Sequence, residues 1–202
     1  TAMPLPEATA RSKASTMPAA RATHAMAYDP GRGRVLLFGG DDQNPMDDTW
    51  EWDGTTWTQL LPVTSPPARG GHAMVHAPGQ GRMVLFGGAD GAPLGATWAW
   101  DGTNWVQLFP VATPPASGFH AMAYDPAQGR VVLFGGYNGG QLGETWEWDG
   151  TTWTQRFPPS APSARYWPAI VYDEVVGRVV LVGGGDGTPL GDTWEWNGTT
   201  WS

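Results

Sequence analysis

The chain has 202 residues, enough for one sizeable domain, and no cysteine, which excludes disulfides, thiolate metal ligands and thiol catalysis. Its formal net charge of -8 and pI near 4.7 argue against a nucleic-acid partner, because phosphate binding needs a basic face. No apolar run approaches the roughly 20 residues that span a bilayer, so we expect no membrane insertion.

The first repeated unit of the chain predicts four short strands separated by turns. The run HAMAYD from His24 is the first strand, and PGRG turns the chain into RVLLFGG from Arg34. The loop DDQNPM leads to DTWEWD, and the tight DGTT turn leads to WTQLL from Trp57. No stretch has the periodicity of a helix.

This unit recurs along the chain with a fixed spacing of 48 residues. The spacing links Trp50, Trp98, Trp146 and Trp194, and also the double glycines that begin at Gly39, Gly87, Gly135 and Gly183. Such a period indicates stacked supersecondary units, and four antiparallel strands per unit form a propeller blade. We therefore predict an all-β propeller, one domain over residues 1–202, with four blades of four antiparallel strands at about 17–64, 65–112, 113–160 and 161–202.

Each unit carries three tryptophans in the pattern Trp-x-Trp-x(4)-Trp, as in DTWEWDGTTW from Asp48. Because side chains alternate along a strand, Trp50 and Trp52 lie on one face and Glu51 on the other. We expect the wide rings to fill the wedge between neighbouring blades, and the paired glycines to let a neighbouring ring or backbone approach. The repeated tryptophans are therefore interpreted as architecture.

The Arg-x-x-His start, the apolar strand ending in Gly-Gly and the spaced aromatics after it resemble kelch repeats over residues 17–202. WD repeats have a shorter period, roughly 40 to 45 residues, and WDG here sits in a turn. The resemblance implies a propeller of the galactose oxidase-like kind. The copper cofactor of galactose oxidase-type enzymes needs a cysteine cross-linked to a tyrosine, so that chemistry is excluded in this chain.

A few aromatic residues fall outside every repeated aromatic column. They are Phe119, Tyr137, Tyr166 and Trp167. All lie in loops that enter a first strand or leave a second strand, which open on one face of a propeller. We predict that they form one patch near blades three and four, which suits stacking on a sugar ring or gripping a peptide. The alternative is a plug that fills a channel mouth widened where Pro168 replaces a histidine.

Histidines at equivalent positions in three blades form a second candidate site. His24, His72 and His120 would point toward one axis, a set that suits zinc or copper, with Pro168 in the fourth blade. A metal-dependent lyase or hydrolase is the function that this arrangement would support. The alternative is a structural role, since a histidine here is part of the kelch-like consensus and would cap strands or bridge blades.

Charged residues bear on whether the ring closes. Arginines open three blades, at Arg21, Arg69 and Arg165, and Ser117 takes this place in the third. Pairing each blade with the next joins Glu51 to Arg69 and Glu147 to Arg165, and leaves the two gaps facing each other. The column of Asp48, Glu144 and Asp192 has the same gap at Ala96 and is the alternative acidic partner.

This pairing predicts a closed four-bladed ring in which Arg21 meets an acid in blade four. Residues 1–16 would close the last blade, with the segment from Ala10 to Thr16 supplying its outer strand. The alternatives are a piece of a larger propeller, or an incomplete ring that a second chain completes as a homo-oligomer. Kelch-like rings usually have five to seven blades.

The function that these observations favour is a binding module whose partner is a glycan or a protein segment, with no nucleic acid. The metal-dependent enzyme remains the alternative. We expect an extracellular or periplasmic bacterial protein.

Overall fold

The computed structural model describes residues 11–13 and 17–202. These residues form four antiparallel sheets and one short 3-10 helix, η1 (Pro78–Gln80). The sheets are the blades of a β-propeller, so the predicted all-β fold with four blades is confirmed. No helix in the described ranges is long and apolar enough to cross a membrane.

The strands follow the predicted order in every blade. Blade one contains β2 (Ala25–Asp29), β3 (Arg34–Phe38), β4 (Thr49–Trp52) and β5 (Trp57–Leu61). Blade two contains β6 (Ala73–Ala77), β7 (Arg82–Phe86), β8 (Thr97–Trp100) and β9 (Trp105–Leu108). Blade three contains β10 (Ala121–Asp125), β11 (Arg130–Phe134), β12 (Thr145–Trp148) and β13 (Trp153–Arg156). Blade four contains β14 (Ala169–Asp173), β15 (Arg178–Val182) and β16 (Thr193–Trp196), and a single bridge from Trp196 to Trp201 takes the fourth place.

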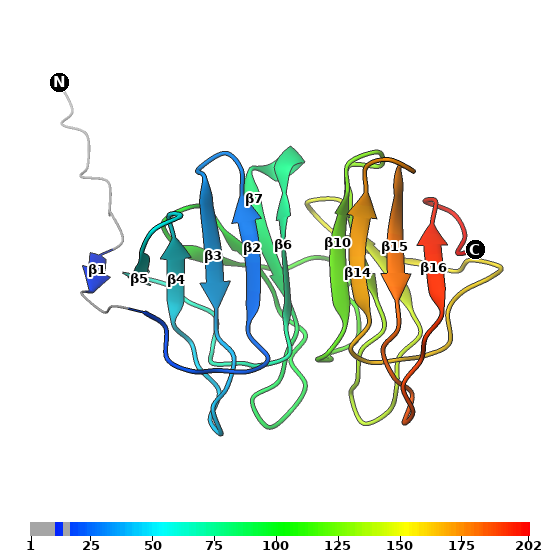
Figure 1. Ribbon diagram of the computed structural model, residues 1–202, viewed down its shortest axis with the longest axis horizontal. Coiled ribbons are helices and arrows are strands. Elements are labelled where there is room, and N and C mark those ends of the chain that lie inside the picture. The colour runs from blue at the N-terminus through cyan, green and yellow to red at the C-terminus, as the bar shows by residue number, and fades with distance from the viewer. Residues whose placement is uncertain (1–10, 14–16) are drawn as a thin grey trace.

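The first strand of each blade lies nearest the middle of the molecule, and the later strands fan outward (Figure 1). The loops that enter β2, β6, β10 and β14 gather at the lower edge in this view, together with the loops that leave β3, β7, β11 and β15. They form what we call the loop face. Residues that are distant in sequence therefore meet there.

Local chemistry explains the turns of each blade. The carboxylate of Asp53 accepts the backbone N–H groups of Thr55 and Thr56, both at 2.8 Å, and so closes the DGTT turn. After β3, Gly39 has a φ of 60°, and a Cβ there would lie 2.7 Å from the carbonyl oxygen of Arg69 in the next blade. The paired glycines thus allow the backbone of the next blade to approach closely, as predicted.

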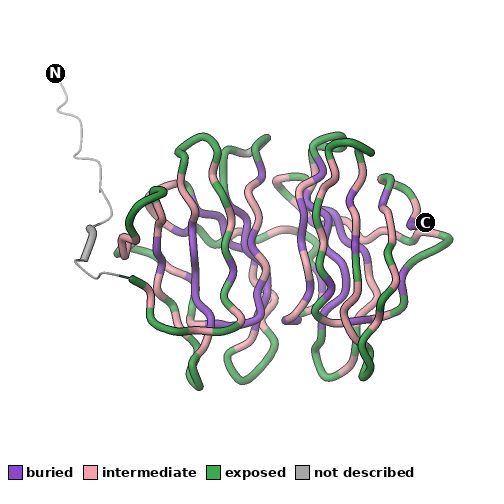
Figure 2. The backbone as a smooth tube through the Cα atoms, viewed as in Figure 1, coloured by how far each residue is buried: buried purple, intermediate pink, exposed green. Residues whose placement is uncertain are grey.

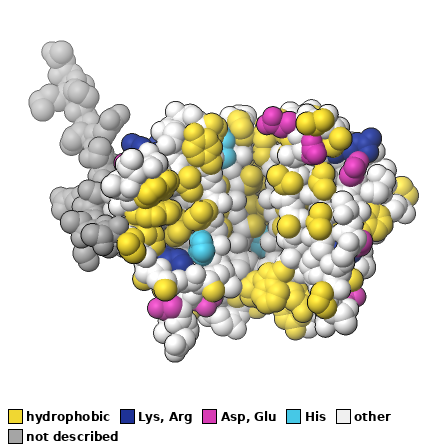
Figure 3. Space-filling model, viewed as in Figure 1, with side chains coloured by type: hydrophobic (Ala, Val, Ile, Leu, Met, Phe, Trp, Pro, Cys, Tyr) yellow, Lys and Arg dark blue, Asp and Glu magenta, His cyan; other side chains and the backbone are white. Residues whose placement is uncertain are grey.

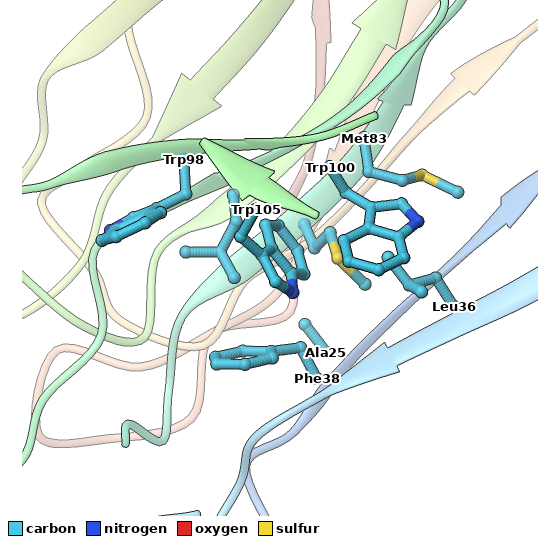
Figure 4. Packing of buried hydrophobic residues seen from close by; sticks show 9 residues of the cluster. Ala25, Leu36, Phe38, Met83, Trp98, Trp100 and Trp105 are labelled. Atoms are coloured by element: carbon cyan, nitrogen blue, oxygen red, sulfur yellow. The ribbon is translucent and has the colours of Figure 1, made fainter. Parts of the chain in front are cut away.

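The tryptophans form the core between blades. Trp100 and Trp105 pair across β8 and β9 with ring centroids 5.4 Å apart, and they pack against Leu36 and Phe38 of blade one (Figure 4). The indole N–H of Trp105 also donates to the Thr49 hydroxyl at 3.0 Å. Equivalent clusters join blades two and three and blades three and four. The predicted architectural role of the repeated tryptophans is confirmed by this packing.

The predicted pairing of each arginine with an acid of the preceding blade is wrong. Arg21 forms an ion pair with Asp48 of its own blade at 2.5 Å, and Arg165 does the same with Asp192 at 2.6 Å. The acidic column was therefore the alternative one, and each pair lies within a blade. Burial alone would raise the pKa of Asp48, but hydrogen bonds from Arg21 and Trp50 and the charge of Arg21 hold it below its usual value.

Pairing within a blade leaves Arg69 without an acid in this column, because blade two has Ala96 where the other blades have Asp48, Glu144 and Asp192. The Arg69 guanidinium donates to the oxygens of Pro67 and Gly87, each at 2.9 Å, and Arg21 and Arg165 make the equivalent carbonyl bonds in addition to their ion pairs. Burial lowers the pKa of Arg69 to about 10, so it stays charged at neutral pH. This buried cation is tolerated because its Nε and Nη1 groups donate to carbonyls and the negative charge of Asp90 favours the charged form.

The N-terminal strand β1 (Arg11–Lys13) pairs with β5 of blade one, Arg11 lying opposite Leu61. The prediction that this segment supplies the outer strand of blade four is therefore wrong for residues 11–13. The rest of that prediction concerns residues 1–10 and 14–16, which lie outside the described residues.

The predicted closure of blade four on blade one is also wrong. The core clusters of the described residues join blades one to two, two to three and three to four, and none joins four to one. Strands β2 and β14 keep exposed residues along the front of the molecule (Figure 2). The wide aromatic rings between blades hold neighbouring sheets apart, and at that spacing four blades leave the ring open.

Candidate functional site

One position on the loop face has the same unusual backbone in all four blades. Its residues have positive φ: 53° at Thr23, 66° at Gly71, 62° at Phe119 and 54° at Trp167. The N–H of Gly71 donates to the carbonyl of Thr23 at 2.8 Å, that of Phe119 to Gly71 at 2.6 Å, and that of Trp167 to Phe119 at 2.7 Å. This ladder runs from blade to blade and sets neighbouring side chains next to one another.

The left-handed backbone favours glycine, so the two aromatic residues of the ladder carry a local conformational cost. A non-glycine residue in this region costs roughly 1 to 2 kcal/mol. Blade two has glycine at this position, whereas blades one, three and four have Thr23, Phe119 and Trp167. Strained positions of this kind are frequent at binding sites, which motivates a functional hypothesis for these two side chains.

The structure brings together the four aromatic residues that depart from the repeat. Phe119 meets Trp167 edge to face with ring centroids 5.1 Å apart, and Trp167 meets Tyr166 at 5.2 Å. Tyr137, across the blade boundary, meets Tyr166 at 5.9 Å. A cluster of apolar side chains is visible at the lower edge, beneath β10 and β14 (Figure 3). The predicted patch is therefore a geometric fact, while its binding role stays a prediction.

These side chains line a pocket of about 370 Å³, which we call the aromatic pocket. Its lining is Phe119, Tyr137, Gln141, Tyr166 and Trp167. The volume lies within the usual range for small-ligand sites, roughly 300 to 1,000 Å³. Trp167 is 62% exposed and Tyr137 is 40% exposed, so the four aromatic residues frame a hollow and leave it unfilled. This exposure weighs against the alternative in which they only plug the channel mouth.

Gln141 is the one lining residue that the sequence interpretation missed. Its side-chain N–H donates to the carbonyl of Asp186 at 2.9 Å, which ties blade three to blade four and fixes the amide at the rim. A signal was present in the sequence, because Gln141 replaces a proline in the column Pro45, Pro93 and Pro189. The same search for departures from the repeat would have found it.

Two further hollows flank the aromatic pocket. One, of about 350 Å³, shares Phe119 and extends over Asp41, Gly70 and Asp90 of blades one and two. The other, of about 340 Å³, shares Tyr166 and Trp167 and extends over Thr188 of blade four. The three hollows are linked through shared aromatic side chains. The loop face therefore offers an elongated surface, longer than a single small molecule needs.

The histidines lie in the blade contacts. His72 and His120 are buried, and each packs against a phenylalanine of the preceding blade, Phe38 at 5.5 Å and Phe86 at 5.4 Å between ring centroids. Desolvation by burial lowers the pKa of His72 to about 3 and that of His120 to about 4. Both rings are therefore neutral at physiological pH. His24, the third histidine, is exposed at the open end.

The hypothesis of a zinc or copper site at His24, His72 and His120 is not supported by this geometry. In the described ranges, no three histidine, aspartate or glutamate side chains lie in an arrangement that could hold a metal ion. His72 and His120 instead pack between neighbouring blades, as the alternative interpretation expected, whereas His24 is exposed. The metal-dependent lyase or hydrolase thus lacks the ligand group on which it depended.

Comparison with known proteins gives no further assignment. No protein-family model matches the chain, and no curated protein sequence is detectably similar to it.

Proposed function

We propose that the chain is a kelch-type propeller that works as a glycan-binding module, with the aromatic pocket as its centre. The observation that carries the proposal is the convergence of Phe119, Tyr137, Tyr166 and Trp167 in one open pocket. The apolar faces of sugar rings stack on aromatic side chains, and Trp167 presents a largely exposed ring.

The lining of the aromatic pocket favours a neutral ligand rich in hydroxyl groups. None of its five residues is charged, and Gln141 offers an amide that both donates and accepts hydrogen bonds. A charged peptide side chain would find no ion-pair partner among these residues. The flanking hollows support recognition of an oligosaccharide rather than a single sugar.

The kelch assignment has its own support. Each arginine that begins a kelch-like unit, at Arg21, Arg69 and Arg165, donates to the carbonyl of the first glycine of the double glycine in its own blade. The two motifs that carry the resemblance therefore contact each other in space.

Binding is tested by titrating a panel of neutral oligosaccharides while the intrinsic tryptophan fluorescence is recorded. We expect at least one saccharide class to bind wild-type protein, and the Trp167→Ala variant to bind it about 10- to 100-fold more weakly, a typical loss for a central aromatic contact. Phe157→Ala is the matched control, since Phe157 is 82% exposed and lines none of the three hollows.

If the Trp167→Ala variant binds saccharides as tightly as wild type, the aromatic pocket is not the binding site. Binding of peptides with no binding of saccharides would replace the glycan by a protein segment at the same surface.

A further inference from the structure

The contact between neighbouring blades is built the same way three times. On one side stands a phenylalanine at the end of the second strand, and on the other the third tryptophan of the next blade. Their ring centroids are 5.2 Å apart for Phe38 and Trp105, 5.4 Å for Phe86 and Trp153, and 5.4 Å for Phe134 and Trp201. The indole N–H of each of these tryptophans donates to a buried threonine of the preceding blade, Thr49, Thr97 or Thr145.

The backbone adds a fixed set of hydrogen bonds to every contact. Between blades one and two, the N–H of Gly40 donates to Arg69 O at 2.9 Å, and the N–H of Arg69 donates to Met46 O at 3.0 Å. The loop ladder adds the bond from Gly71 to Thr23. The next two contacts repeat all three bonds at positions 48 and 96 residues later. The contact therefore has two defined and complementary halves.

Blade one exposes the half that receives a preceding blade. Met26 is 50% exposed, whereas its equivalents Met74 and Met122 are buried. Trp52 and Trp57 are only partly buried, although the equivalent tryptophans of the other blades are almost completely buried. In the described part of the chain, the indole N–H of Trp57 makes no hydrogen bond, and the ladder ends at the N–H of Thr23.

Blade four exposes the opposite half. Val182, in the place of the phenylalanines, is 45% exposed, and Val171 is 62% exposed. The hydroxyl of Thr193, equivalent to the three threonines that accept an indole N–H, lies in an exposed residue. The carbonyl of Trp167 is the other end of the ladder. Each group that blade one leaves unpaired thus has its counterpart on blade four.

We propose that blade four of one chain packs on blade one of a second copy, and that two chains close into one ring of eight blades. Apolar side chains lie on both halves of the side turned to the viewer in Figure 3. A copy rotated by half a turn about the propeller axis and placed over that side offers its blade one to this blade four and its blade four to this blade one. Both contacts form together, as a closed two-fold assembly requires.

The complementarity fits a second copy as the occupant. The exposed face of blade four is complementary to a surface that offers an indole N–H, a methionine side chain and the N–H of a residue with positive φ, at the spacing of the repeat. Blade one of this chain carries all three groups. Val182 has a smaller apolar side chain than the phenylalanines at the equivalent position, so it buries less apolar surface in the contact. The contact is therefore weaker than those inside the chain, and the dimer dissociates on dilution.

The oligomeric state tests the proposal directly. Sedimentation velocity of the 202-residue chain at about 100 µM should give twice the monomer mass of 21.6 kDa, with dissociation on dilution. Met26→Glu on blade one and Val182→Glu on blade four should each raise the dissociation constant by about 100-fold or more, since each puts a charge in both contacts. Val111→Glu is the matched control because Val111 is fully exposed on an outer loop, and it should leave the dimer intact.

Mixing separates this arrangement from any other dimer. When the Met26→Glu and Val182→Glu variants are mixed, a heterodimer of the two has one unaltered contact. In that contact, blade four of the Met26→Glu chain packs on blade one of the Val182→Glu chain, and neither of these blades carries a substitution. The mixture should therefore regain dimers that neither variant forms alone. A wild-type chain that stays monomeric overturns the proposal, and so do variants that still dimerise or a mixture that regains nothing.

Discussion

Trp105 and Trp167 have the same side chain and opposite surroundings. A tryptophan stands at the position of Trp105 in every blade. Trp105 itself is completely buried, and its indole N–H donates to Thr49 of the neighbouring blade. Trp167 occurs once, is 62% exposed, and stands on a left-handed backbone beside other aromatic residues that also occur once. In a protein made of repeats, the recurring residue holds the blades together, and the residue that departs from the repeat is free to serve one surface.

The largest expected effect is the loss of a repeated tryptophan. Trp153→Ala should lower the free energy of unfolding by about 3 to 5 kcal/mol, because it leaves a cavity against Phe86 and removes the donor to Thr97. Trp167→Ala should change it by less than about 1 kcal/mol, since the ring is mostly exposed. Urea denaturation of both variants measures the difference. If both variants lose a similar amount of unfolding free energy, Trp167 is a structural residue like Trp153.

A second prediction concerns pH and the buried histidines of the blade contacts. Unfolded histidine titrates near pH 6.5, whereas burial lowers the folded pKa of His72 to about 3 and of His120 to about 4. Between these values the unfolded chain binds more protons, so stability is complete above pH 6.5 and falls as the pH is lowered. The two rings together should cost about 3 kcal/mol between pH 6.5 and pH 5.

Denaturation curves at several pH values check this dependence. The double variant His72→Gln with His120→Gln should be less stable at pH 7 but should lose less stability on acidification. His24→Gln is the control, because His24 is exposed and its change should leave most of the slope in place. An unchanged slope in the double variant would assign the acid sensitivity to other groups.

The sequence predicted the blades well because local and repeated signals determine them. Alternation fixed the faces of the tryptophans, DGTT fixed the turns, and the 48-residue period fixed the blade boundaries. Departures from that period also identified Phe119, Tyr137, Tyr166 and Trp167, which the structure then brought together. Such departures are visible without coordinates, since the repeat supplies its own reference.

Interactions between blades could not be predicted in the same way. A column of arginines and a column of acids give no information on whether a pair joins within a blade or across two, because both columns have the same period. Arg69 shows the difficulty, since its guanidinium bonds to backbone carbonyls although blade two has alanine where the other blades have an acid. The closure of the ring depends on the angle between sheets, which is set by the volume of packed rings, and residue spacing does not encode that volume.

The smallest expected effect isolates the backbone of Trp167 from its side chain. Trp167→Gly and Trp167→Ala both delete the ring and should weaken saccharide binding equally. Glycine adopts a φ of 54° without a steric penalty, whereas alanine does not. The glycine variant should therefore be more stable than the alanine variant by about 1 kcal/mol, measured by urea denaturation. The difference between the two cancels whatever the ring itself contributes to packing.

Gly71→Ala is the reciprocal test at the equivalent position of blade two. Its φ is 66°, and a Cβ there would lie 2.5 Å from the Phe119 ring, so this change should cost more than the glycine–alanine difference at Trp167. Equal stability of Trp167→Gly and Trp167→Ala would mean that the ladder does not impose the left-handed backbone on blade four. If glycine is the more stable, the tryptophan keeps a conformational cost that the fold does not need, which supports a role for its ring in the aromatic pocket.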